Sequence, residues 1–86
     1  MTAVEKQKVE EILHALEQLQ QDATIPRNVK QKLETVAHIL QEDEELSLRL
    51  NKALNELDDV SDDANIEPYT RTQLWNILSM LESLNA

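Results

Sequence analysis

The chain has 86 residues, a length that allows one domain with a modest hydrophobic core. It contains no glycine and no cysteine, which excludes disulfides, thiolate nucleophiles and sulfur ligands for a metal. Seventeen acidic residues against eight basic ones give a net charge of −9, which argues against binding to nucleic acid or to an anionic membrane. With no signal-like apolar start and no apolar run of about 20 residues, the chain is expected to be a soluble cytoplasmic protein.

Two helices are predicted in the first half of the chain. Thr2 and Glu5 have the spacing of a capping box, and apolar residues at helical spacing then continue to about Gln21. Pro26 suits the first turn of a second helix, where its missing N–H has no partner to lose. The apolar stripe of that helix ends near Gln41.

Two more helices are predicted in the second half. The acidic run 42–45 favours the positive N-terminal end of a third helix, whose apolar stripe continues to Val60. After a turn over residues 61–67, Pro68 opens a fourth helix that continues to Leu84. Every predicted helix is amphipathic, so none is expected to be stable alone.

The second half of the chain repeats the first at an offset of 41 residues, as in Leu13 and Leu54. The identical pairs are Leu13/Leu54, Leu16/Leu57, Asp22/Asp63, Ala23/Ala64, Ile25/Ile66, Leu33/Leu74 and Leu40/Leu81. Each unit is a helix, a short turn and a second helix. The sequence therefore predicts one domain over residues 1–86, with one hairpin over about 2–41 and another over about 43–85.

The predicted fold class is all-α, an antiparallel up-and-down four-helix bundle built from two repeated helical hairpins. Short connections make consecutive helices antiparallel neighbours, and a bundle buries all four apolar stripes together. A fragment of a helical-repeat solenoid is the alternative, because a period near forty is also typical of stacked helix pairs. Solenoids need about three or more repeats, which favours the closed bundle.

Several strings of this sequence resemble one family of short archaeal proteins, uncharacterised protein family 0147. The strings are Ile25-Pro26-Arg27-Asn28-Val29, Asp63-Ala64-Asn65-Ile66, Arg71-Thr72-Gln73-Leu74-Trp75-Asn76-Ile77 and Ser79-Met80-Leu81-Glu82. The resemblance runs over almost the whole chain; it implies a four-helix bundle and implies no activity. The family usually has Asp-Pro-Asn-Met-Pro before the last helix, whereas this chain departs from that string over residues 63–68, so a different shape is expected in that turn.

Up-and-down topology places the first and third turns at the same end of the bundle, where candidate polar residues gather. This candidate interaction or structural polar end consists of Arg27, Asn28, Lys30, Tyr69, Arg71, Thr72, Trp75 and Asn76. Cations in a first helical turn oppose the helix macrodipole, so Arg27 and Arg71 require a compensating contact. Either each arginine bonds the aspartates and free carbonyls at the end of the preceding helix, or the two capture an anion such as phosphate.

Four further residues carry expectations of their own. Trp75 is expected at the edge of the core with its indole N–H bonded, and otherwise as an exposed anchor for a contact. Asn76 is expected to complete a buried hydrogen bond. Leu48 and Met80 are candidate interface positions, because both can protrude from the core-facing surface.

Two patterns resemble metal sites but lack required ligands. Glu11 and His14 have the Glu-x-x-His spacing of di-iron bundles, but Thr35 stands where a second motif ending at His38 needs a glutamate. The stretch 58–65 alternates like a calcium loop but lacks its central glycine and closing glutamate. We therefore expect no metal and no cofactor. With no nucleophile beside a general base and no glycine-rich phosphate loop, no catalytic residue is predicted either.

The preferred functional hypothesis is a small cytoplasmic helical binding or adapter module, not an enzyme. It would act through an unknown protein partner or through self-association, with Arg27, Tyr69, Arg71 and Trp75 on the preferred surface. The alternative is a binder of an anion or small ligand at the same end, beside Arg27 and Arg71. A third, minor hypothesis is a subunit that contributes residues to an enzyme complex.

Overall fold

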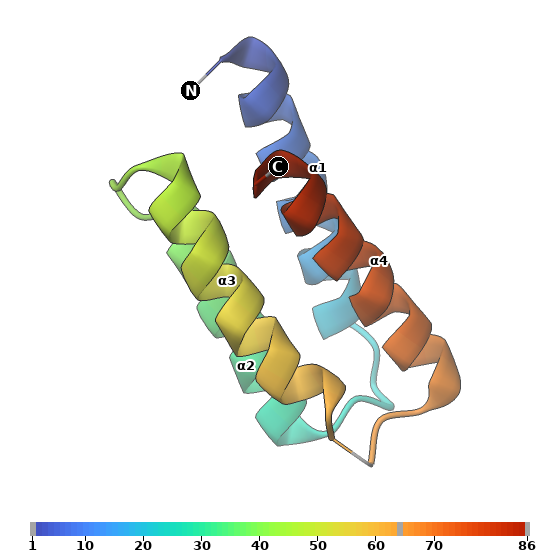
Figure 1. Ribbon diagram of the computed structural model, residues 1–86. Helices are drawn as coiled ribbons and strands as arrows, with labels where there is room; N and C mark the ends of the chain where they lie inside the picture. Colours follow the sequence, from blue (N-terminus) through green and yellow to red (C-terminus); the bar gives the residue numbers. More distant parts are fainter. Residues whose placement is uncertain (1, 64, 86) are drawn as a thin grey trace.

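The structure is a computed structural model that describes residues 2–63 and 65–85, so Ala64 of the second turn lies outside the described residues. Its elements are α1 (Ala3–Gln20), α2 (Arg27–Leu40), α3 (Leu46–Ser61) and α4 (Pro68–Asn85), shown in Figure 1. All regular structure in the described part is helical, which confirms the predicted all-α class. The predicted boundaries are correct to within a residue or two.

The helices differ in how their N-termini are capped. At α1, the Thr2 hydroxyl accepts the Glu5 N–H at 3.1 Å while the Glu5 carboxylate accepts the Thr2 N–H at 2.9 Å, which is the predicted capping box. Pro26 and Glu45 are the N-cap residues of α2 and α3 and provide no side-chain cap. Pro26 thus precedes the first turn of α2 instead of lying in it.

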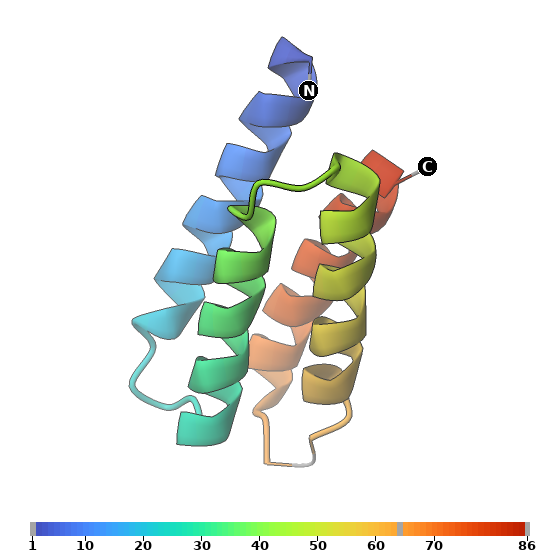
Figure 2. The ribbon, with the colours of Figure 1, turned by 90° about the vertical axis from the view of Figure 1, so that its left-hand side faces the viewer.

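The four helices form an antiparallel ring in which each helix packs against two neighbours. Helices α1 and α3 each lie between α2 and α4, and the bundle measures 36 × 20 × 19 Å. Figures 1 and 2 show that the α1-to-α2 and α3-to-α4 turns share one end, opposite the α2-to-α3 turn and both chain ends. We call this the turn end, comprising residues 21–26, the described residues of 62–67 and the adjoining first turns of α2 and α4. No helix in the described part is long and apolar enough to cross a membrane.

The core contains the residues at the centres of the predicted stripes. The buried apolar residues are Val9, Ile12, Leu16, Leu19, Val29, Leu33, Val36, Leu40, Leu50, Ala53, Leu57, Val60, Ile66, Leu74, Ile77 and Leu81. Leu13 and Leu54, which are identical partners in the repeat, lie half-buried at the edge of this core. Thr70 and Arg49 are buried as well, which the sequence did not predict.

The repeat extends to the hydrogen bonds of the turn end. The Asp22 carboxylate accepts the Thr24 N–H at 2.9 Å, and the Asp63 carboxylate accepts the Asn65 N–H at 2.9 Å. Two pairs of backbone bonds match as well. The Asp22 N–H donates to the Leu19 carbonyl at 3.1 Å, as the Asp63 N–H donates to the Val60 carbonyl at 3.1 Å. The Ile25 N–H donates to the Asp22 carbonyl at 3.3 Å, as the Ile66 N–H donates to the Asp63 carbonyl at 3.4 Å. The two turns of this chain are therefore built alike in these bonds, and the expected departure from the family's turn stays a prediction.

Candidate functional site

Arg71 is committed to the structure of the turn end. One guanidinium nitrogen donates to the Ser61 carbonyl at 2.6 Å, and the other terminal nitrogen donates to the Asp63 carbonyl at 3.0 Å. These carbonyls follow the last turns of α3, where the helix itself provides no donors. The half-buried Arg71 thus fills the structural role that the first hypothesis gives it.

Arg27 does not fill the same role. Its side chain is exposed and makes no hydrogen bond or ion pair with any residue that the structure describes. Adjacent helical positions project about 100° apart. Because the neighbouring Asn28 reaches Asp63, Arg27 is directed elsewhere. The predicted bond from Arg27 to the end of α1 is therefore wrong. Lys30, the counterpart of Arg71 in the repeat, is also exposed.

Asn28 and Asp63 join the two hairpins at the turn end. The Asn28 amide donates to the Asp63 carboxylate at 3.1 Å, across 35 positions of sequence. The N–H of Asn65, the Asn28 amide and the charge of Arg71 all lower the pKa of Asp63, with the Asn65 N–H acting most strongly. Asp63 is therefore an ionised link between both turns.

The two aromatic residues are exposed and face different directions. The exposed fraction is 67% for Tyr69 and 54% for Trp75, so the expected core-edge position of Trp75 is wrong. Six positions along an α-helix turn through about 600°, so the two side chains leave α4 about 120° apart and form no single aromatic platform. Neighbouring Asn76 is also exposed and makes no described bond, contrary to expectation. The Thr72 hydroxyl donates within α4, to the Pro68 carbonyl at 3.1 Å.

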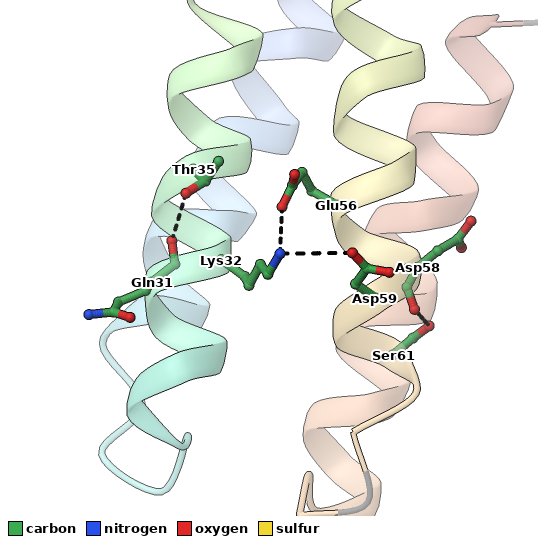
Figure 3. A network of polar contacts seen from close by, with 7 residues as sticks. All are labelled: Gln31, Lys32, Thr35, Glu56, Asp58, Asp59 and Ser61. Atoms are coloured by element: carbon green, nitrogen blue, oxygen red, sulfur yellow. Dashed lines mark hydrogen bonds and ion pairs between the residues drawn. The ribbon is translucent and has the colours of Figure 1, made fainter.

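Lysines that the sequence analysis did not single out hold α3 against α2 and the turn before it. Lys32 lies 3.0 Å from the Glu56 carboxylate and 3.8 Å from the Asp59 carboxylate (Figure 3). Its hydrogen bond with Glu56 is the main cause of its raised pKa. Lys52 lies 2.9 Å from Glu44, a residue of the turn before α3. Charged residues are common on the solvated faces of helices, so the sequence alone does not indicate which of them pair. The arrangement of the helices shows that these do.

Figure 3 also shows how hydroxyl groups close local turns beside these pairs. The Thr35 hydroxyl donates to the Gln31 carbonyl at 3.1 Å in α2, and the Ser61 hydroxyl donates to the Asp58 carbonyl at 3.0 Å in α3. Both bonds span the turn of a single helix. They add a side-chain donor to backbone carbonyls of the same helix.

Arg49 is a buried cation at the opposite end of the bundle. Only 8% of it is exposed, and its guanidinium donates to the Leu40 carbonyl at 2.8 Å, at the end of α2. Leu46 and Ala53, three positions before and four after, mark the apolar stripe of α3. Its position beside that stripe indicates burial. The sequence did not predict this burial because charged side chains are usually exposed to water.

No metal centre is found among residues 2–63 and 65–85, where no three histidine or carboxylate side chains converge. His14 and His38 are exposed on separate helices. Glu42, four positions after His38, lies 3.7 Å from the ammonium group of Lys52.

Two pockets lie between α1 and α4. One, of about 250 Å³, is lined by Lys8, Glu11, Ile12, Ser79, Met80 and Ser83. The other, of about 240 Å³, is lined by Ala15, Gln18, Leu19, Asp22, Tyr69, Gln73 and Ile77. Of the two candidate interface positions, Met80 is half-buried and lines the first pocket, and Leu48 is 46% exposed on α3.

Comparison with known proteins gives the same assignment at the levels of sequence and structure. The model of the uncharacterised protein family UPF0147 matches residues 1–84. A UPF0147 protein from Archaeoglobus fulgidus is 34% identical over 85 residues, which covers 99% of this chain and 98% of that protein. A crystal structure of a UPF0147 protein from Thermoplasma acidophilum matches with a TM-score of 0.89 at 36% identity, covering 96% of this chain and 99% of that one.

Proposed function

The chain belongs to the uncharacterised protein family UPF0147, and we propose that it is a cytoplasmic, non-enzymatic helical module that binds another protein through the turn end and the adjoining surface of α4. The observation that carries this proposal is the exposure of Trp75. A 54% exposed indole leaves a large apolar surface in water, although the domain buries the centre of every apolar stripe. Tryptophan is enriched among the residues that dominate binding energy at protein interfaces.

The surroundings of Trp75 have the composition of an interface with an apolar centre and a polar rim. Arg71 and Thr72 lie one turn before it on the same side of α4, and Asn76 follows it. Since Arg71 and Thr72 bond to backbone carbonyls, their side chains are held in place before a partner arrives. A surface that is already ordered loses less conformational entropy on binding.

The charge of the chain indicates what the partner surface contains. The net charge is −9, and Asp58, Asp62 and Glu67 near the turn end are exposed, without a side-chain bond to any described residue. Complementary potentials raise the rate of association and suppress wrong partners. We expect a partner with an apolar hollow for the indole, surrounded by lysine or arginine.

The anion-binding alternative lacks the arrangement that it needs. Arg71 already donates from both terminal nitrogens to carbonyls, and Arg27 is directed away from the cluster of Asn28 and Asp63. The carboxylate of Asp63 would also repel an anion placed there. No contact in the described part of the turn end favours a phosphate over a protein partner.

Affinity purification from a lysate of the source cells tests the proposal, with wild type, Trp75→Ala and Leu48→Ala as baits. Leu48 is the matched control, because it is another large apolar residue, 46% exposed on a different helix. Loss of a central interface tryptophan costs about 2 kcal/mol or more, so Trp75→Ala should reduce capture of the partner about thirtyfold. Leu48→Ala should retain the partner.

An Arg27→Ala bait separates the surface contact from stability, since Arg27 is exposed and makes no hydrogen bond or ion pair with the described residues. Reduced capture by this bait, at unchanged thermal stability, would support a partner at the turn end. A partner that is retained by Trp75→Ala, or lost equally with Leu48→Ala, would contradict the proposed surface.

A further inference from the structure

The 41-residue repeat relates two helix-helix seams. Shifting a position of α3 back by 41 gives its counterpart in α1, and shifting a position of α2 forward by 41 gives its counterpart in α4. The α2/α3 seam therefore corresponds, position by position, to the α1/α4 seam. The backbones of α1 and α4 pack together less closely than those of α2 and α3, so the two seams differ in spacing as well as in side chains.

Polar side chains close the α2/α3 seam along its length. Four cross-links do this: Asn28 to Asp63 at 3.1 Å, Lys32 to Glu56 at 3.0 Å, Lys52 to Glu42 at 3.7 Å and Arg49 to the Leu40 carbonyl at 2.8 Å. The long side chains of arginine and lysine also cover the apolar residues beneath them with their methylene groups. This seam is thus sealed by the chain itself.

The α1/α4 seam lacks every one of these cross-links. The counterparts of Arg49, Lys52, Glu56, Asp63, Asn28, Lys32 and Glu42 are Lys8, Glu11, Ala15, Asp22, Tyr69, Gln73 and Ser83. Ala15 stands in place of Glu56, and Ser83 stands in place of Glu42. These side chains are too short to bridge α1 and α4. Within the described residues, no hydrogen bond or ion pair crosses from α1 to α4.

Both pockets described above lie where these cross-links are missing. The pocket beside Lys8 and Met80 is the counterpart of the place that Arg49 and Lys52 fill. The pocket beside Ala15 and Tyr69 corresponds to the place where Lys32 meets Glu56. We call the line of these two pockets along the α1/α4 seam the groove; Ile12, Leu19, Ile77 and Met80 are among its lining residues.

One wall of the groove is complementary to itself. The residues of α1 and its following turn that face along it are Val4, Lys8, Glu11, Ala15, Gln18 and Asp22, at alternating spacings of four and three. Lys8, Ala15 and Asp22 are seven residues apart, so a cation lies about 10.5 Å along α1 on one side of a small central residue, and an anion lies just beyond the C-terminal end of α1 on the other side. Val4, at the start of this wall, is 63% exposed.

We propose that the α1/α4 groove is the contact surface for a second copy of this chain, with a two-fold axis crossing α1 at Ala15. Antiparallel α1 helices would then place Lys8 of each copy opposite Asp22 of the other, and the short Ala15 side chains would allow close approach. Tyr69 and Met80 would flank the contact and lose exposed apolar surface. This surface is distinct from the outer side of α4 that presents Trp75.

The ionic groups needed for this contact are available. Lys8 makes no ion pair with any described residue. Asp22 uses one carboxylate oxygen for the N–H and the hydroxyl of Thr24, at 2.9 and 2.7 Å, and these two bonds lower its pKa. Its other oxygen is free of described bonds and can accept Lys8 of the second copy. The net charge of −9 on each copy opposes association, which suits a reversible dimer.

Sedimentation equilibrium over a range of concentrations tests the proposal, with circular dichroism to verify folding. Wild type should dimerise reversibly, and Lys8→Glu should weaken the dimer about tenfold, because both symmetry-related ion pairs become repulsions of similar size. The charge swap Lys8→Glu/Asp22→Lys should restore it. Lys6→Glu is the matched control, since it makes the same change two positions away, about 200° around the helix.

A steric variant keeps the test decisive if the charge swap fails to fold, because Asp22 also orders its turn. Ala15→Trp places a large side chain on the two-fold axis and should abolish dimerisation, with circular dichroism to verify that the half-buried position still allows folding. A monomeric wild type at all concentrations would overturn the proposal. So would a dimer that Ala15→Trp leaves intact, or one that Lys6→Glu weakens as much as Lys8→Glu does.

Discussion

Single residues at the turn end differ in their hydrogen bonds, and we expect Arg71 to contribute more to stability than Arg27. Replacing Arg71 with alanine removes two charge-assisted bonds from the half-buried end of α3, so we expect a loss of about 1–3 kcal/mol in the free energy of unfolding. Arg27→Ala should change it by less than about 0.5 kcal/mol, because Arg27 has no described contact. Urea unfolding followed by circular dichroism measures both.

Arg71→Lys provides the sharper control for this prediction. Lysine keeps the charge but lacks the planar fork that reaches the Ser61 and Asp63 carbonyls together. It should therefore recover only part of the loss. Equal stability of Arg71→Lys and wild type would show that charge alone matters at this position.

Asp63 should make the stability of the protein depend on pH in acid. The Asn65 N–H, followed by the Asn28 amide and the Arg71 charge, lowers the pKa of folded Asp63 below its ordinary value of 3.8. This contribution is fully present above the ordinary value and is lost as the pH falls through the lower folded pKa. Asp63→Asn should therefore flatten the decline of melting temperature below about pH 4, while Asp62→Asn should not. Parallel declines for Asp63→Asn and wild type would contradict this role.

The residues that sequence reasoning misplaced are those for which hydrophobicity was a poor guide. Trp75 is apolar but exposed, because it lies outside the buried stripe of α4. Arg49 is charged but buried, because it lies beside the apolar stripe of α3. Periodicity gives the direction in which a side chain leaves its helix. It does not give the distance to the next helix, and that distance decides whether a carbonyl such as that of Leu40 is within reach.

At the scale of the helix, the N-terminus of α3 lacks a side-chain cap that would stabilise it. Glu45 is the N-cap residue and makes no side-chain cap bond, because its carboxylate is one methylene longer than the geometry prefers. Glu45→Asp keeps the charge and should raise the free energy of unfolding by about 0.5–1 kcal/mol. The thermal melting temperature measures this change.

The same substitution in the middle of a helix is the control. Glu10→Asp on the exposed face of α1 has no free N–H to cap and should slightly destabilise the protein, because aspartate is a poorer helix former. If Glu45→Asp also destabilises, the N-terminus of α3 is already satisfied by other groups.

Helix positions were predictable because each stripe has a clear period and each boundary has a chemical signal. The capping box at Thr2 and the opening of α4 at Pro68 were both predicted. Pro26 was predicted in the first turn of α2, but it is the N-cap residue, one position before the helix. The sequence does not distinguish these two positions, because a proline fits both. Such one-residue errors leave the buried face of a helix unchanged.

At the scale of the molecule, four amphipathic helices with short turns could be arranged from sequence because one bundle buries every stripe. The sequence did not predict that one seam is sealed and its counterpart is open. That contrast depends on pairs such as Lys32 with Glu56, as against Gln73 with Ala15, and these pairs become visible only once the helices are placed. The repeat thus determined the fold, and its departures created the candidate surfaces.

Photo-crosslinking at position 75 tests most directly whether the protein binds a partner through α4. A photoreactive phenylalanine derivative replaces Trp75 in one version of the protein and exposed Gln31 on α2 in another, each expressed in the source cells. We expect one dominant covalent adduct with a specific protein from position 75 and none from position 31. Adducts that are absent at both positions, or equally varied at both, would contradict a binding surface centred on Trp75.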